Sequence, residues 1–222
     1  MIKKSKQAEA VEIIDILRKV TAKLPEPMSL IIAREYHKDP FLILISCLLS
    51  LRAKDKKTLS VVRKLFSYAK TPQDFVLMSQ EQLETLIYEI GFYKQKARTV
   101  RFVSNEILTR FNGKVPKNRN DLMSIRGIGP KTASLVLGMA YNIPAICVDV
   151  HVNRLSNLLG LVKTKDPSDT EVELEKIIPK EDWIEFNHLL VKLGQNLPKI
   201  FPHLPKSMQD DLSSLMGKSV KF

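Results

Sequence analysis

The residues whose types and spacing could carry out chemistry are Lys131 and Asp149, eighteen positions apart. Lys131 follows the glycine hairpin 126–129, and Pro130 suits the first position of a helix, so Lys131 is predicted to lie in the first helical turn. A cation is disfavoured there because the helix macrodipole is positive at its N-terminus. Desolvation at this position and the helix field both disfavour the ammonium, so we expect a lowered pKa for Lys131. The neutral amine is the form of lysine that attacks carbon. The alternative is an ordinary solvated lysine.

Asp149 immediately precedes a helical run predicted over 150–159. Aspartate is a favoured N-cap, because its carboxylate accepts a backbone N–H bond from the first turn. A carboxylate held ionised in this way can also stabilise positive charge on a bound substrate. Both roles are compatible with the sequence. His151 and the other histidines show no metal-ligand spacing with one another or with a cysteine, so we predict no metal site.

The elements that must position these residues are predicted to be helices. Apolar residues recur at helical spacing in several segments, whereas no sustained alternation of period two occurs. Proline and glycine breakers separate the segments, which predicts an all-α fold of about ten short helices. These breakers include Asp39-Pro40, Asn112-Gly113, Gly129-Pro130, Gly160 and Gly194.

The chain of 222 residues carries a formal charge of +11 and has a pI of about 9.6, as expected for a protein that binds a polyanion. A basic surface that serves solubility is the alternative. The longest apolar run, 41–49, is far shorter than the roughly 20 residues of a membrane helix. The basic residues 1–6 lead into an amphipathic helix, so we predict no signal peptide and an intracellular protein.

Two cysteines, Cys47 and Cys147, both lie in apolar neighbourhoods. We predict that they are buried structural thiols, because a thiol in such a setting behaves as a small hydrophobic group. The sequence leaves a disulfide between them open.

Two segments, 127–133 and 148–154, resemble the helix-hairpin-helix and catalytic-aspartate segments of the endonuclease III family of DNA glycosylases. The similarity also includes 40–55 and Ile90-Gly91-Phe92-Tyr93 with Lys96-Ala97, and it extends over about residues 10 to 216. The resemblance implies two all-helical lobes with a DNA-binding cleft between them. The expected lobes are 33–143, which carries the helix-hairpin-helix, and 1–32 with 144–222.

The resemblance also implies roles for individual residues. Lys131 would attack the sugar C1′ and form a Schiff base, while Asp149 would support charge separation. The hairpin glycines Gly127 and Gly129 would let a DNA phosphate approach the amides of a helix N-terminus. Arg52 and Phe92 would fill the gap that an extruded nucleotide leaves, although an exposed arginine and a core phenylalanine would look the same in sequence. Most bacterial members have glutamine at the position of Arg52, so the preferred opposite base stays open.

Most family members end in a four-cysteine iron-sulfur loop with the spacing C-x6-C-x2-C-x5-C. A cluster needs thiolates, and this chain has none at the matching positions, which are Leu197, Leu204, Ser207 and Ser213. We therefore predict no iron-sulfur cluster, no metal and no organic cofactor. Lys199 and Lys206 in the same loop are expected to contact DNA.

The sequence therefore predicts a bifunctional DNA glycosylase and AP lyase of base excision repair. It would remove oxidised pyrimidines from double-stranded DNA through the lysine Schiff base and β-elimination. We expect a monomer that is cytoplasmic and associated with the nucleoid. The alternatives are the same fold and chemistry on oxidised guanine or mismatched thymine, or a non-catalytic DNA-binding module.

Overall fold

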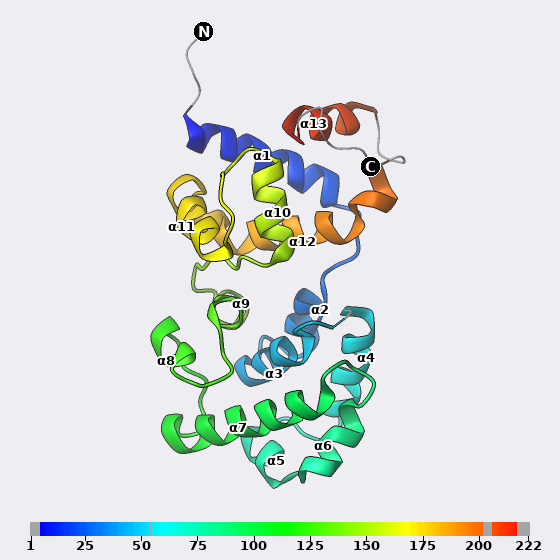
Figure 1. The fold of residues 1–222 in the computed structure, drawn as a ribbon, viewed down its shortest axis with the longest axis vertical. Helices are drawn as coiled ribbons and strands as arrows, with labels where there is room; N and C mark the ends of the chain where they lie inside the picture. The colour runs from blue at the N-terminus through cyan, green and yellow to red at the C-terminus, as the bar shows by residue number, and fades with distance from the viewer. Residues whose placement is uncertain (1–4, 54, 202–205, 217–222) are drawn as a thin grey trace. The chain divides into compact units, whose positions relative to one another are not determined.

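The computed structural model describes residues 5–53, 55–201 and 206–216, and these form α-helices with one short 3-10 turn (Figure 1). No strand occurs in these ranges, which confirms the predicted all-α class. None of the described helices is both long and apolar enough to cross a membrane. The chain divides into two compact units, a middle unit, Pro27–Ile143, and a terminal unit, Met1–Glu26 with Pro144–Phe222.

The middle unit is built around α3, in which the nine consecutive residues 41–49 are all buried. A helix that is apolar on every side belongs inside a core, and α3 packs against α2, α4, α7 and α9. Its start is set by Pro40 in the first turn and by Asp39, whose side chain accepts from the Leu42 amide at 2.9 Å. The helices of this unit are α2 (Met28–Glu35), α3 (Pro40–Ser50), α4 (Asp55–Phe66), α5 (Pro72–Leu77), α6 (Gln80–Ile87), α7 (Tyr93–Phe111), α8 (Arg119–Met123) and α9 (Pro130–Tyr141).

The described residues contain more helices than the expected ten, because short helices begin at side-chain caps that an apolar stripe does not reveal. Thr71 and Asp74 form a capping box at the start of α5, and Asn118 caps α8 by accepting from the Asp121 amide. These helices have six and five residues, too short for a periodic pattern.

The terminal unit has α12 at its centre, packed against α1 and α10. Its apolar stripe includes Phe186, Leu190, Leu193 and Leu197, which are all buried. The elements of this unit are α1 (Lys6–Thr21), α10 (Val150–Leu158), α11 (Pro167–Ile177), the 3-10 turn Lys180–Asp182, α12 (Trp183–Ile200) and α13 (Lys206–Met216).

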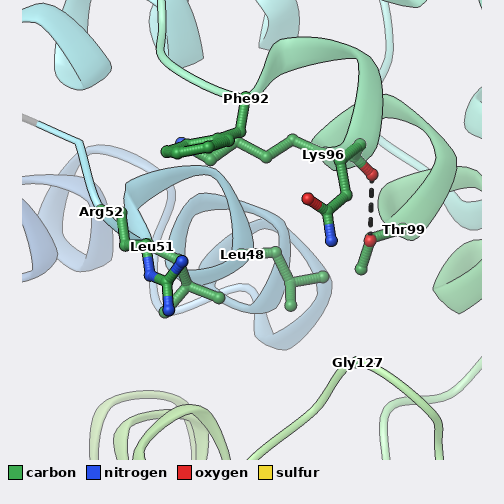
Figure 2. A pocket seen from close by; sticks show the side chains of 8 residues that line it. Leu48, Leu51, Arg52, Phe92, Lys96, Thr99 and Gly127 are labelled. Carbon is green, nitrogen blue, oxygen red and sulfur yellow. Dashed lines mark hydrogen bonds between the residues drawn. The ribbon is translucent and has the colours of Figure 1, made fainter.

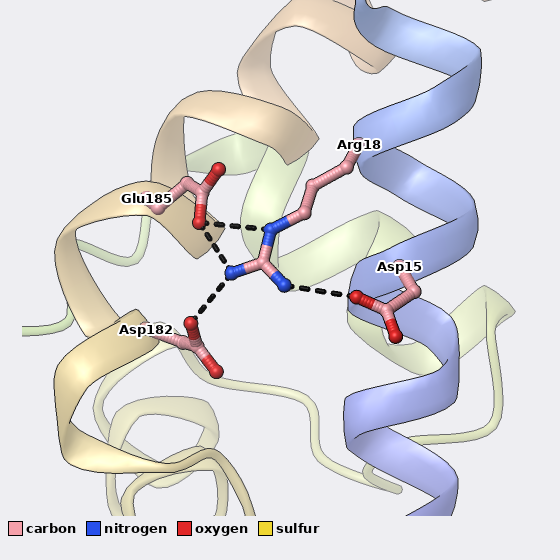
Figure 3. A network of polar contacts seen from close by, with 4 residues as sticks. All are labelled: Asp15, Arg18, Asp182 and Glu185. Carbon is pink, nitrogen blue, oxygen red and sulfur yellow. Dashed lines mark hydrogen bonds and ion pairs between the residues drawn. The ribbon is translucent and has the colours of Figure 1, made fainter.

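An ion network joins α1 to the start of α12 (Figure 3). The Arg18 guanidinium donates to Glu185 at 2.6 and 3.1 Å, to Asp182 at 2.7 Å and to Asp15 at 2.9 Å. Arg18 is partly exposed, so each pair contributes modestly, but one planar cation that holds three carboxylates sets the register between the two helices.

Gly194 was expected to break a helix, and this expectation is wrong, because the residue lies inside α12. A Cβ added there would lie 2.4 Å from Nδ1 of His151 in α10. The glycine therefore serves close packing between two helices, which outweighs its poor helix propensity.

Cys47 in α3 and Cys147 before α10 are both buried, as predicted for structural thiols. Burial raises the pKa of the Cys47 thiol to about 12, although the nearby Lys131 charge opposes the rise. A thiol with so high a pKa is almost entirely protonated at neutral pH, and it is therefore unreactive.

Candidate functional site

The hairpin between α8 and α9 contains two glycines that meet different constraints. Gly127 has a φ of 102°, and a Cβ on it would lie 2.9 Å from Cγ2 of Thr99, so the fold itself requires glycine there. Gly129 is the N-cap of α9 with a φ of −93°, and a Cβ on it would meet nothing within 4 Å. Close packing therefore requires glycine at 127, whereas at 129 glycine is favoured only as an N-cap and no neighbour excludes a Cβ.

Lys131 lies in the first turn of α9, after Gly129 as N-cap and Pro130 in the first turn. The expectation that the protein itself would desolvate this amine is not met, because Lys131 is exposed. The hairpin lies at the surface, where Gly127, Gly129 and Pro130 are exposed as well. The first turn of α9 places the lysine at the positive end of the helix dipole.

Asp149 is the N-cap of α10, and its Oδ1 accepts from the Val152 amide at 2.9 Å. The side chain is half-buried, so one carboxylate serves as the cap while remaining accessible. Asp149 belongs to the terminal unit, whereas Lys131 belongs to the middle unit.

Helix α12 holds the segment around Asp149 at two points. The Asn187 side chain, which is 4% exposed, donates to the Cys147 carbonyl at 2.6 Å. Gly194 gives His151 its place against α12. Together these contacts set the chain direction on both sides of Asp149. Sequence reasoning missed Asn187, whose only signal was a polar residue next to Phe186 on a buried stripe.

A cavity of about 410 Å³ in the middle unit brings together Arg52, Phe92 and Gly127, three of the residues predicted for DNA binding. Figure 2 shows the pocket among the end of α3, the start of α7 and the hairpin loop. Its lining residues are Leu48, Leu51, Arg52, Phe92, Gln95, Lys96, Thr99 and Gly127.

Arg52 and Phe92 share an unusual backbone conformation. Their φ angles are 53° and 60°, in the left-handed region that residues with a Cβ adopt at a cost of about 1–3 kcal/mol. Both side chains are exposed, and the Phe92 ring is 60% exposed. The alternative that Phe92 is a core residue is therefore excluded, and strained backbone presents both side chains at the rim of one pocket.

Lys96 on α7 is buried, in contrast to the exposed Arg52 and Phe92 that line the same pocket. The residue is 7% exposed, and its Nζ has no hydrogen-bond partner among the described residues. Burial lowers the pKa of Lys96 below its ordinary value of 10.5. The sequence showed Lys96 only as part of a family motif, and nothing in the pattern indicated that its amine would be buried.

The structure describes two of the four C-terminal positions that matched the family's cluster cysteines, and neither is a thiol. Leu197 is 3% exposed within the apolar core of the terminal unit, and Ser213 is exposed. Leu204 and the Ser207 side chain lie outside the described residues. Within residues 5–53, 55–201 and 206–216, no group of three or more histidine, cysteine or acidic side chains could hold a metal.

The two lysines predicted to contact DNA in this segment differ in how much of them is described. Lys206 is exposed at the start of α13 and pairs with Asp210 at 3.0 Å. Lys199 lies in α12, and its side chain is outside the described residues.

Comparison with known proteins places this geometry in a family. The model of the HhH-GPD superfamily of base excision DNA repair proteins matches residues 45–180. Endonuclease III of Thermotoga maritima is 40% identical over 161 residues, which are 72% of this chain and 76% of that protein. Endonuclease III of Bacillus subtilis is 37% identical and covers 72% of this chain and 73% of its own length.

Solved structures agree with this placement. A non-covalent endonuclease III–DNA complex matches with a TM-score of 0.81 at 32% identity, covering 96% of each chain. A trapped covalent endonuclease III–DNA intermediate matches with a TM-score of 0.79 at 31% identity, covering 95% of this chain and all of that one. The chain therefore belongs to the HhH-GPD superfamily of base excision DNA repair proteins, and within it to the endonuclease III family.

Proposed function

We propose that the protein is a bifunctional DNA glycosylase and AP lyase of base excision repair that acts on oxidised pyrimidines in double-stranded DNA. The observation that carries the proposal is Lys131 in the first turn of α9, directly after the glycine hairpin of a family member. Similarity to a trapped covalent endonuclease III–DNA intermediate supports covalent chemistry at this lysine.

In the proposed reaction, the neutral Lys131 amine forms a bond to the sugar C1′ while the bond from C1′ to the base breaks. The base leaves with the bonding electrons and takes up a proton. The nitrogen on C1′ then loses a proton and forms a double bond to C1′, while the C1′–O4′ bond breaks and O4′ takes up a proton, which opens the sugar ring and gives a Schiff base. Loss of a C2′ proton then expels the 3′ phosphate by β-elimination. Because Lys131 is exposed, bound DNA must supply the dry surroundings that favour the neutral amine.

Asp149 has the proposed role of stabilising the positive charge that develops on the sugar as the base departs. Its Oδ1 accepts from the Val152 amide at 2.9 Å, which holds the carboxylate at the start of α10. Its half-buried position leaves the group accessible to a ligand.

The hairpin is the proposed phosphate site. The first amides of a helix lack intrahelical partners and lie at the positive end of its dipole, so they suit an anion. The open space at Gly129 gives a phosphate room to approach these amides. The net charge of +11 would add a sequence-independent attraction that weakens steeply with salt.

Arg52 and Phe92 are the proposed side chains that enter the gap left by the extruded nucleotide. Their exposure and their left-handed backbone at the rim of one pocket support this role, because strain of this kind concentrates at functional sites.

The protein is also proposed to lack an iron-sulfur cluster, since Leu197 belongs to the core and the chain has only two cysteines. Stoichiometric iron and labile sulfide in purified protein would refute this.

Lys199 and Lys206 are proposed to contact DNA phosphates. The protein is also proposed to act as a monomer, at the nucleoid in the cytoplasm.

Borohydride trapping on a duplex with one abasic site tests the proposed chemistry. Wild-type protein should form a covalent complex, and Lys131→Gln should form none. Lys64→Gln is the matched control, because it removes the same charge from an exposed position in the same unit and should trap normally. Equal trapping by wild type and Lys131→Gln would reject the nucleophile. A panel of lesion duplexes then separates oxidised pyrimidines from oxidised guanine and mismatched thymine.

A further inference from the structure

An acidic segment interrupts this basic chain. Residues 71–93 contain no lysine, arginine or histidine, and no other stretch of the sequence without a basic side chain is as long. The same residues carry the carboxylates of Asp74, Glu81, Glu84 and Glu89. They include α5 and α6 of the middle unit, which both pack against α7 (Figure 1). A protein with a formal charge of +11 therefore has one local surface that repels a polyanion.

A groove of about 700 Å³ lies on this segment, and we call it the acidic groove. None of the described residues that line it is basic, and none of them lines the pocket of Arg52 and Phe92 or belongs to the glycine hairpin. The acidic groove is lined by Tyr68, Asp74, Leu77, Met78, Glu81, Gln82, Thr85 and Leu86.

The acidic groove has apolar side chains that the fold itself does not use. Leu77 at the end of α5 is 73% exposed, and Tyr68 is 67% exposed. Met78 and Leu86 line the same groove and are half-buried. A single exposed leucine is ordinary, whereas several apolar side chains that line one hollow are typical of a surface that contacts another molecule.

The two carboxylates that line the acidic groove are held in place. Asp74 Oδ2 accepts from two backbone amides at 2.9 and 2.8 Å, and Glu81 Oε2 accepts from the Ser79 hydroxyl at 2.9 Å. Backbone hydrogen bonds lower the pKa of both Asp74 and Glu81, and the charge of Arg101 lowers the pKa of Glu81 further. Both groups are therefore ionised at neutral pH, and a cationic ligand would meet charges that are already positioned.

The charge and the architecture exclude several occupants. DNA is excluded because its phosphates would face the carboxylates. A second copy of the chain, bound by the same surface on both subunits, would place carboxylate against carboxylate. An extended peptide gains affinity by adding a strand to a sheet edge, and the described part of the middle unit contains no strand. A helix needs no such edge, because its backbone groups bond within the helix.

We propose that the acidic groove is a docking site for another protein, and that the segment bound there is an amphipathic helix with an apolar stripe flanked by lysine or arginine. The apolar stripe would pack on Leu77 and Tyr68, and the basic side chains would lie beside Asp74 and Glu81. Apolar contacts would supply most of the affinity, since exposed ion pairs contribute little. The carboxylates would select a basic partner and speed its association.

Peptide titrations of the full-length, ¹⁵N-labelled protein test the proposal. The probe is a synthetic peptide of about 18 residues, long enough to form a helix, with leucine at i, i+3, i+4 and i+7 spacing and lysine elsewhere. It should shift the amide signals of residues 71–86 in a saturable way. A peptide with glutamine in place of leucine should bind there at least about tenfold more weakly, because it lacks the apolar anchors. A peptide with glutamate in place of lysine should give no saturable shift at these amides.

Two pairs of variants assign the binding to the acidic groove. Leu77→Ser should raise Kd for the lysine–leucine peptide about tenfold, and Glu81→Gln should raise it about threefold. Met123→Ser is the control for the first, because Met123 is also an exposed apolar residue of the middle unit. Glu89→Gln is the control for the second, because it removes the same charge from the same segment outside the groove. Both controls should keep the wild-type Kd.

Several results would overturn the inference. Absence of saturable shifts at residues 71–86 with the lysine–leucine peptide below about 1 mM would refute the docking site. Unchanged Kd in both Leu77→Ser and Glu81→Gln would place the peptide elsewhere. Tighter binding of the glutamate peptide, or of a proline-rich basic peptide, would refute the basic helix. Signals of 71–86 that change with protein concentration alone would indicate a second copy instead.

Borohydride trapping separates this inference from the proposed function. Leu77→Ser and Glu81→Gln should be trapped on an abasic duplex as well as wild type, because the acidic groove shares no residue with the proposed DNA-binding site. Loss of trapping in either folded variant would refute a separate docking site. If wild type is not trapped, the proposed lyase function fails, while the peptide titrations still decide the docking site.

Discussion

Replacing Asp149 separates the two roles that a carboxylate at this N-cap can have. Asp149→Ala removes the acceptor of the 2.9 Å bond from the Val152 amide, whereas Asp149→Ser keeps an N-cap oxygen without the charge. Loss of a cap lowers the free energy of unfolding by about 1 kcal/mol, with a range of 0.5–2. Asp149→Ala should therefore melt roughly 2–4 °C below wild type for each kcal/mol lost, and Asp149→Ser should melt within about 1 °C of it.

The effect on chemistry should not follow the effect on stability. Both variants lack the carboxylate, so the single-turnover rate of base release should fall by about 100-fold or more in each. About 100-fold is the lower end of the rate enhancement that a group assisting proton transfer typically contributes. Ser79→Ala is the matched control, because Ser79 caps α6 by accepting from the Gln82 amide at 3.2 Å. It should lose similar stability and keep the wild-type rate.

A wild-type rate in Asp149→Ser would refute the reasoning, because it would reduce Asp149 to a helix cap. The assay needs single-turnover conditions, with enzyme in excess over a labelled lesion duplex, so that product release does not limit the rate. Circular dichroism at the assay temperature establishes that each variant is folded before its rate is compared.

The remaining predictions concern three positions. Gly194→Ala should lower the free energy of unfolding by on the order of 1 kcal/mol in urea titrations, because overpacking against His151 outweighs the gain in helix propensity; a more stable variant would contradict the packing argument. Gly129→Ala should weaken binding to abasic duplex about tenfold while lowering stability by no more than about 1 kcal/mol, since a Cβ meets only open space; unchanged binding would remove the phosphate site. Lys96→Met should raise stability by about 1–3 kcal/mol near pH 7, because a buried, unpartnered ammonium is removed. The stability gain of Lys96→Met should shrink as pH rises toward 10.5, because the folded protein releases the Lys96 proton at a lower pH than the unfolded chain does, and wild type therefore becomes more stable. Arg52, the other charged group lining the pocket, stays charged over this range. A gain that stays constant with pH would contradict the buried ammonium.

Local signals in the sequence were sufficient for several features of the site. Pro130 after a glycine placed Lys131 in a first helical turn, and Asp149 before an apolar period indicated an N-cap. The structure has both, with α9 beginning at Pro130 and α10 at Val150. These features depend on residues within a few positions of one another, and capping and turn chemistry act over that range.

Features that depend on distant partners could not be predicted in this way. Gly194 looks like a helix break until His151, which lies 43 positions earlier, is placed against it. The buried amide of Asn187 needs the Cys147 carbonyl, 40 positions away, to explain it. Lys96 reads as one more surface lysine in a basic chain, because burial of its amine is set by the packing around α7.

Helix α12 connects the proposed carboxylate to the segment in which most family members bind a metal. Asn187, Gly194 and Leu197 lie on this one helix, within about 15 Å along its axis at 1.5 Å per residue. The first two residues hold the chain on either side of Asp149, and the third is buried in the core of the terminal unit. Apolar packing at Leu197 therefore helps to fix α12 in this unit. The orientation of Asp149 should therefore be more sensitive to Leu197→Ala than to any change at the exposed Ser213.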